Sequence, residues 1–150
     1  MQKIALGLLF VSASLSLHAA PSSPPSQEDY TKLQANLLCE HNLPLGKLTS
    51  LVASLNGHML ENRSGSYRGT YTIPFGFYIL NQPITEFNIT RALNANGNYV
   101  YRYQTPIPNL SPSEVAALLN IPQNMETKLY SKNNLSIQIA NGQTVLICTK

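Results

Sequence analysis

Residues 95–105 read ANGNYVYRYQT and residues 140–150 read ANGQTVLICTK, so the same turn sequence occurs twice, each time before a strand-like run. An Asn-Gly pair accepts the positive φ angles of a tight hairpin turn at little cost. Residues 84–93 and 135–139, which precede the turns, alternate between apolar and polar types. Alternation with a period of two is typical of a half-buried strand. Each copy therefore predicts an antiparallel hairpin, the first of which we expect to end at Pro106.

Three amphipathic helices are predicted outside these hairpins. The first begins at Ser26, a suitable N-cap, and runs to Leu38. In the second, apolar residues recur at i, i+3, i+4 and i+7 between Leu48 and Leu55, and Gly57 is expected as its left-handed end. The third, SPSEVAALLN (111–120), carries Ser, Pro and Glu at the positions of a capping box. The sequence therefore predicts an α+β fold, with two or three helices packed on an antiparallel sheet.

Helix, extended segment and hairpin follow one another twice, which favours a degenerate internal repeat. Two helices end in similar runs, LVASLNG (51–57) and VAALLNI (115–121). The copies differ in length, and their incoming strands differ by one residue in phase before the turn. The alternative is that a small α+β protein uses two Asn-Gly hairpins without duplication, and the sequence leaves both open.

The first twenty residues, MQKIALGLLFVSASLSLHAA, predict a secretory signal peptide (1–20). Lys3 supplies the positive charge, an apolar run follows, and cleavage is expected after Ala19 or Ala20. The next residues, PSSPPS (21–26), predict a flexible linker, and 27–150 predict a single α+β domain. The mature protein is expected to be periplasmic or secreted, without a transmembrane span and, because no cysteine lies near the cleavage site, without a lipid anchor.

The charge of the chain is low and scattered. Its formal net charge is +3, and loss of Lys3 with the signal peptide lowers this by one. No run of Lys or Arg occurs, so no nucleic acid is expected among the partners.

Two cysteines, Cys39 and Cys148, remain in the mature chain. An even count in an exported protein predicts a disulfide, the alternative being two free buried thiols. The bridge would join the end of the first helix to the last strand, which otherwise frays as a chain terminus.

Catalytic and metal-binding patterns are not found, so we expect neither an enzyme nor a cofactor. A Ser-His-Asp triad needs a carboxylate to orient the histidine, and the one aspartate is Asp29, in the first turn of the first helix. Cys39, Glu40 and His41 are adjacent, but a structural zinc site needs further paired ligands. With Cys39 committed to the disulfide, no metal site is predicted.

Tyrosines give the clearest candidate for a binding surface. Tyr99, Tyr101 and Tyr103 alternate along one face of a strand, with Val100 and Arg102 on the other. If Val100 faces the core, the tyrosines face solvent and offer large contact areas with polar ends. The opposite assignment places the tyrosines in the core and exposes Arg102. The sequence leaves both assignments open.

A polar stretch, ENRSGSYRGT (61–70), predicts a surface loop and a second candidate site. Its segment Ser64-Gly65-Ser66-Tyr67 resembles the protruding loops that periplasmic lysozyme inhibitors push into a lysozyme cleft. Arg68 adds positive charge that could meet an acidic partner. The candidate binding residues here are Ser64, Ser66, Tyr67 and Arg68.

SPSEVAALLNIP (111–122) and LSIQIANGQTVLI (135–147) together resemble the outer-membrane assembly component BamE (the SmpA/OmlA family) and the repeated halves of β-lactamase inhibitor proteins. The resemblance implies helices packed on one face of a small antiparallel sheet. The missing catalytic patterns and the alternating tyrosines lead us to expect a non-catalytic binding protein whose partner is another protein of the cell envelope, such as an exported enzyme that it inhibits. The alternative is an envelope assembly factor resembling BamE.

Overall fold

The computed structural model describes residues 25–63 and 68–150, which form three helices and seven strands. The predicted signal peptide and most of the predicted linker lie outside the described residues. The helices are α1 (Gln27–Leu37), α2 (Leu45–Ser54) and α3 (Pro112–Leu119). The predicted α+β class is confirmed.

All strands of the described chain belong to one antiparallel sheet with the order β1-β2-β3-β4-β7-β6-β5. The strands are β1 (His58–Arg63), β2 (Arg68–Ile79), β3 (Gln82–Leu93), β4 (Tyr99–Ile107), β5 (Tyr130–Lys132), β6 (Leu135–Ala140) and β7 (Gln143–Thr149). Both predicted hairpins are present, as β3–β4 and β6–β7. They meet where β4 pairs with β7, near the middle of the sheet.

The register between β4 and β7 is symmetric. Tyr103 pairs with Cys148, and each lies six residues after the glycine of its own hairpin turn. On either side of this pair, Arg102 pairs with Thr149 and Gln104 with Ile147. The strand order repeats the symmetry, because β2-β3-β4 is followed by β7-β6-β5.

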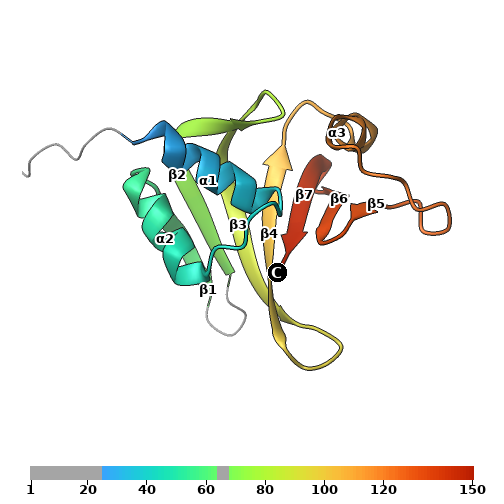
Figure 1. The fold of residues 1–150 in the computed structure, drawn as a ribbon, viewed down its shortest axis with the longest axis horizontal. Coiled ribbons are helices and arrows are strands. Elements are labelled where there is room, and N and C mark those ends of the chain that lie inside the picture. The colour runs from blue at the N-terminus through green and yellow to red at the C-terminus, as the bar shows by residue number, and fades with distance from the viewer. Residues whose placement is uncertain (1–24, 64–67) are drawn as a thin grey trace, which may run out of the picture.

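All three helices lie on one face of the sheet (Figure 1), where they close a single apolar core. α1 and α2 cover the side of β1 to β4, and α3 lies over the β5–β6 side. The sheet side of the core consists of cross-strand pairs such as Tyr71–Phe87, whose rings stack, and Ile137–Leu146. The opposite face is open and largely polar; there the Thr70 hydroxyl donates to the Asn88 side-chain oxygen at 2.6 Å.

The helix ends follow from local sequence. The Ser26 hydroxyl accepts the Asp29 N–H at 3.1 Å, and the predicted capping box of α3 is present. In that box the Glu114 carboxylate accepts hydrogen bonds from the Ser111 hydroxyl and N–H, which lower the pKa of Glu114. At the end of α2 the left-handed residue is Asn56, with φ 57°, and not Gly57 as predicted. Gly57 is required for space instead, because a Cβ there would lie 2.6 Å from the Thr72 carbonyl oxygen.

Several predicted boundaries were wrong because strand pairing overrides local composition. Most of the expected loop 61–70 is strand, since β1 and β2 pair up to Arg63 and Arg68. β4 continues through Pro106, which pairs with Val145 of β7. This proline is tolerated because pairing of β4 with β3 has already ended at Gln104, so no ladder bond on that side is lost.

Candidate functional site

The three alternating tyrosines of β4 are neither all exposed nor all buried, and we call them the tyrosine stripe: Tyr99, Tyr101 and Tyr103. Tyr103 is 2% exposed and belongs to the core, Tyr101 is half-buried, and Tyr99 is 62% exposed. All three lie on the helix-covered face, and Arg102 on the other face is exposed. Exposure therefore increases along β4 towards the turn, because the β3–β4 hairpin extends beyond the helices, as Figure 1 shows.

Three side chains gather near the tip of this hairpin, and we call them the tip cluster: Arg91, Leu93 and Tyr99. Leu93 pairs with Tyr99 across the hairpin, and both side chains are more than 60% exposed. The half-buried Arg91 guanidinium lies 4.2 Å from the centre of the Tyr99 ring. A cation–π contact of this kind restrains both side chains without neutralising the charge. The cluster is therefore an ordered apolar and cationic surface.

The turn that closes this hairpin is ordered by the side chain of its first residue, Asn94. The Asn94 side-chain oxygen accepts the N–H groups of Asn96 and Asn98 at 3.0 and 2.9 Å. Gly97 takes the positive φ of 76° that the turn requires. These hydrogen bonds give the turn a single conformation, which fixes the end of the hairpin next to the tip cluster.

The sequence had singled out Tyr99 but missed Arg91 and Leu93 as its partners. A signal was present, because Arg91 falls in the apolar phase of an otherwise alternating strand. Of the other candidates, Ser64, Ser66 and Tyr67 lie outside the described residues. Arg68 begins β2 and pairs with Arg63 and Thr90.

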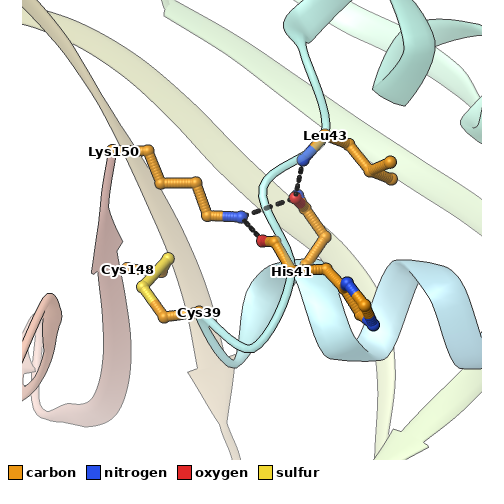
Figure 2. The surroundings of a disulfide bond; sticks show 6 residues. Cys39, His41, Leu43, Cys148 and Lys150 are labelled. Carbon is orange, nitrogen blue, oxygen red and sulfur yellow. Dashed lines mark hydrogen bonds between the residues drawn. A yellow bond between two sulfur atoms is a disulfide. The ribbon is translucent and has the colours of Figure 1, made fainter.

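The predicted disulfide is present, joining Cys39 just after α1 to Cys148 in β7, with 5.5 Å between their Cα atoms (Figure 2). Both cysteines of the chain are used, and Cys148 is fully buried. The bridge spans a sequence separation of 109 residues and ties the loop after α1 to the middle of the sheet.

A polar tether lies beside the disulfide (Figure 2). The fully buried Asn36 side-chain oxygen accepts the Leu43 N–H at 3.1 Å and the Lys150 ammonium at 2.6 Å. Lys150 also donates to the His41 carbonyl oxygen, and its Nζ lies 5.3 Å from the centre of the Tyr103 ring. Burial lowers the pKa of Lys150 to about 8. The tether fixes the base of the β3–β4 hairpin, because Lys150 also exchanges two backbone hydrogen bonds with Tyr101.

Other features of the described chain offer little chemistry. A hollow of about 370 Å³ lies beside the disulfide, between the loop after α1, the end of α3 and the β5–β6 turn, and Leu38, Leu119 and Lys132 are among its lining residues. Within residues 25–63 and 68–150, no three His, Cys, Asp or Glu side chains gather as a metal site would require. None of the helices described there is long and apolar enough to cross a membrane.

No protein-family model matches the chain, and no curated protein or solved structure matches it either. The resemblances to BamE and to inhibitor proteins therefore stay predictions.

Proposed function

We propose that this is an exported, non-catalytic binding protein that contacts another protein outside the cytoplasm through the tip cluster. The observation that carries the proposal is the geometry of that cluster, in which an exposed tyrosine and leucine and a stacked arginine stand on a projecting hairpin. Tyrosine and arginine are the residue types that most often dominate the energetics of protein interfaces. Tyr99 is exposed to solvent, so its side chain has no comparable role in folding.

The sharper form of the proposal is an inhibitor of an exported enzyme. A narrow hairpin with an aromatic end can enter a cleft, which a flat surface cannot. The tether and the disulfide support this form, because they fix the base of the hairpin at Tyr101, Tyr103 and Cys148. A preordered contact surface loses less conformational entropy on binding.

The alternative is an envelope assembly factor resembling BamE. It is favoured by one observation, the packing of all helices on a single face of an antiparallel sheet. We also propose that the two helix–hairpin units are diverged copies, supported by the symmetric register about the Tyr103–Cys148 pair.

The test starts with capture of partners from an envelope extract on tagged residues 21–150. The captured protein is identified and purified, and its dissociation constant is measured for wild type, Tyr99→Ala and Tyr78→Ala. Tyr78 is the matched control, because it is 67% exposed but lies on β2, near the β2–β3 turn. We expect Tyr99→Ala to weaken binding by at least about tenfold, as a hot-spot residue would, and Tyr78→Ala to change it little.

Equal affinities for wild type and Tyr99→Ala would remove the tip cluster as the contact surface. A captured hydrolase whose activity falls on binding supports the inhibitor. Recovery of outer-membrane assembly components supports the BamE-like alternative.

A further inference from the structure

Arg91 is the charged member of the tip cluster, and the fold makes little use of its polar atoms. The side chain is half-buried, and its guanidinium lies over the Tyr99 ring. No described residue accepts a hydrogen bond from this guanidinium, and its Nε atom is buried without an acceptor. Because nearly all buried polar groups in proteins are hydrogen-bonded, the exception at Arg91 indicates a role outside the fold.

The neighbouring cation on the same face of the sheet is used differently. Arg91 pairs with Tyr101, and Tyr101 exchanges two backbone hydrogen bonds with Lys150, so the two cations flank Tyr101 on the helix-covered face. The Lys150 ammonium donates to the Asn36 side-chain oxygen and to the His41 carbonyl oxygen. Lys150 therefore stabilises the fold through its donors, whereas the donors of Arg91 stay free.

No carboxylate among the described side chains neutralises Arg91. The ion pair that those side chains form joins Lys32 to Glu28 on α1. Glu86 is on the same strand as Arg91, but it lies next to the buried Phe87 and points to the opposite, polar face of the sheet. The guanidinium thus carries an uncompensated charge near the exposed end of the hairpin.

The contact with Tyr99 leaves part of the guanidinium accessible to a partner. The carbon at the centre of the guanidinium lies 4.2 Å from the centre of the ring, and the hydrogen bonds of this planar group form at its edge. Nε is its buried nitrogen without a partner, so the two Nη groups keep access to solvent. Leu93 and Tyr99 beside it are exposed. An incoming group therefore meets a restrained cation next to two apolar side chains.

We propose that Arg91 binds the carboxylate of an Asp or Glu side chain on the partner protein, while Leu93 and Tyr99 make the apolar contacts around it. This inference rests on the proposed function, since it assigns a partner chemistry to the tip cluster. A guanidinium binds a carboxylate through two parallel hydrogen bonds, and one carboxylate matches its single charge. A phosphate group fits less well, because phosphate sites gather several cations or use a helix N-terminus.

The probe is the peptide N-acetyl-Leu-Glu-amide, titrated into isotopically labelled residues 21–150 at about pH 6, where the Glu side chain is ionised. The readout is the NMR signal of each arginine Nε–H group, and Arg91→Lys identifies the Arg91 signal by its loss. N-acetyl-Leu-Gln-amide is the neutral control peptide. Arg102, exposed on the opposite face of the same hairpin, is the control site.

We expect the Glu peptide to shift the Arg91 signal saturably, with a dissociation constant at least about threefold lower than at Arg102, because a restrained side chain loses less entropy on binding. The Gln peptide should leave the Arg91 signal unchanged. Three results overturn the inference: equal responses at Arg91 and Arg102, equal responses to the two peptides, or saturation by inorganic phosphate at a lower concentration than by the Glu peptide.

The purified partner allows a second measurement. Arg91→Gln should weaken its binding by at least about tenfold, and Arg91→Lys should restore only part of this loss, since lysine keeps the charge but not the paired donors. Lys47→Gln, which removes one charge from an exposed position on α2, should weaken binding by less than about twofold.

A thermal melt separates lost binding from lost folding. Arg91→Gln should melt close to the wild-type temperature, because no hydrogen bond of the described fold is lost. A lower melting temperature together with lost binding would assign Arg91 to the fold and overturn the inference.

The proposed function and this inference fail separately. If Tyr99→Ala weakens partner binding but Arg91→Gln does not, the tip cluster stands as the contact surface and its carboxylate partner is wrong. If the Glu peptide binds at Arg91 while Tyr99→Ala leaves partner binding unchanged, the tip cluster is wrong as the contact surface and the carboxylate site at Arg91 stands.

Discussion

The two hairpins share an Ala-Asn-Gly turn sequence but occupy different environments. β7 lies between β4 and β6, and its residues 144–148 are all buried. Near the β6–β7 turn Ile139 is exposed but its cross-strand partner Thr144 is buried, whereas at the end of β3–β4 both members of the Leu93–Tyr99 pair are exposed. The shared turn sequence thus places a chain reversal in each copy, whereas the neighbouring strands and helices determine which side chains are covered. The covered hairpin therefore contributes more to the core, and the exposed end of the β3–β4 hairpin is the surface for which we propose binding.

The turns themselves also differ. The second hairpin closes with the two residues Asn141 and Gly142, both at positive φ, between the paired Ala140 and Gln143. The first closes between Leu93 and Tyr99 and needs a longer loop. This difference accounts for the one-residue shift in phase that the sequence showed between the incoming strands.

The largest effect is expected from removing the disulfide that ties β7 to the loop after α1. Cys39→Ala with Cys148→Ala should lower the free energy of unfolding by about 4–5 kcal/mol in the chain-entropy model for a loop of about 100 residues. Urea unfolding of both proteins measures the loss. Reductant should destabilise the wild type similarly and leave the double variant unchanged. If the purified wild type titrates with two free thiols, the bridge is not formed.

The tyrosine stripe gives the next test within a single strand. Tyr103→Ala empties a core position and should cost about 3–5 kcal/mol, as large aromatic truncations do. Tyr99→Ala removes an exposed ring and should change stability by less than about 0.5 kcal/mol. Chemical unfolding of the two variants measures both losses. Similar losses would show that the tip is part of the folded core, and the contrast between the covered and uncovered hairpins would fail.

Local signals in the sequence were sufficient for the three helices and both Ala-Asn-Gly hairpins, but not for β1, which overlaps the expected loop 61–70. The capping box at Ser111, the N-cap at Ser26 and both hairpins follow from nearby residues. The disulfide followed from cysteine count and compartment.

Strand neighbours and exposure could not be predicted in the same way. No local pattern shows that β4 pairs with β7, so the two assignments of the tyrosine stripe stayed open. The alignment of Arg68 with Arg102 could not be predicted for the same reason, because the two positions meet in one row only through Thr90 of β3. Arg91 was visible as an exception to the alternation, but only the packed ring of Tyr99 explains it.

A smaller test uses the two turn glycines. Gly97 and Gly142 both have φ 76° and open space where the Cβ of an alanine would lie, so alanine adds backbone strain and no clash. The strain of a left-handed alanine is roughly 1–2 kcal/mol. We expect Gly142→Ala to lower global stability by that amount, since β7 cannot fray without opening the core. Gly97→Ala should mainly speed hydrogen exchange at the tip, because local opening there avoids the strain. Equal global losses would contradict this.

The smallest expected effect concerns pH and the tether at Lys150. Burial lowers its pKa from the usual 10.5 to about 8. Between these values the unfolded chain binds more protons than the folded one, so the free energy of unfolding should rise with pH from about 8 to about 10.5. Below pH 8 the folded state carries the full cost of the half-buried charge.

Lys150→Met should abolish this rise, whereas Lys47→Met, at an exposed position on α2, should keep the slope of the wild type. The wild type and Lys47→Met share every ionisable group that Lys150→Met retains, so the difference between variants isolates Lys150. The measurement is chemical unfolding at several pH values between 7 and the onset of alkaline denaturation. A wild-type slope in Lys150→Met would mean that the ammonium is as well solvated when folded as when unfolded. The tether would then not restrain the base of the β3–β4 hairpin, and the ordered presentation of the tip cluster would rest on the disulfide and strand pairing alone.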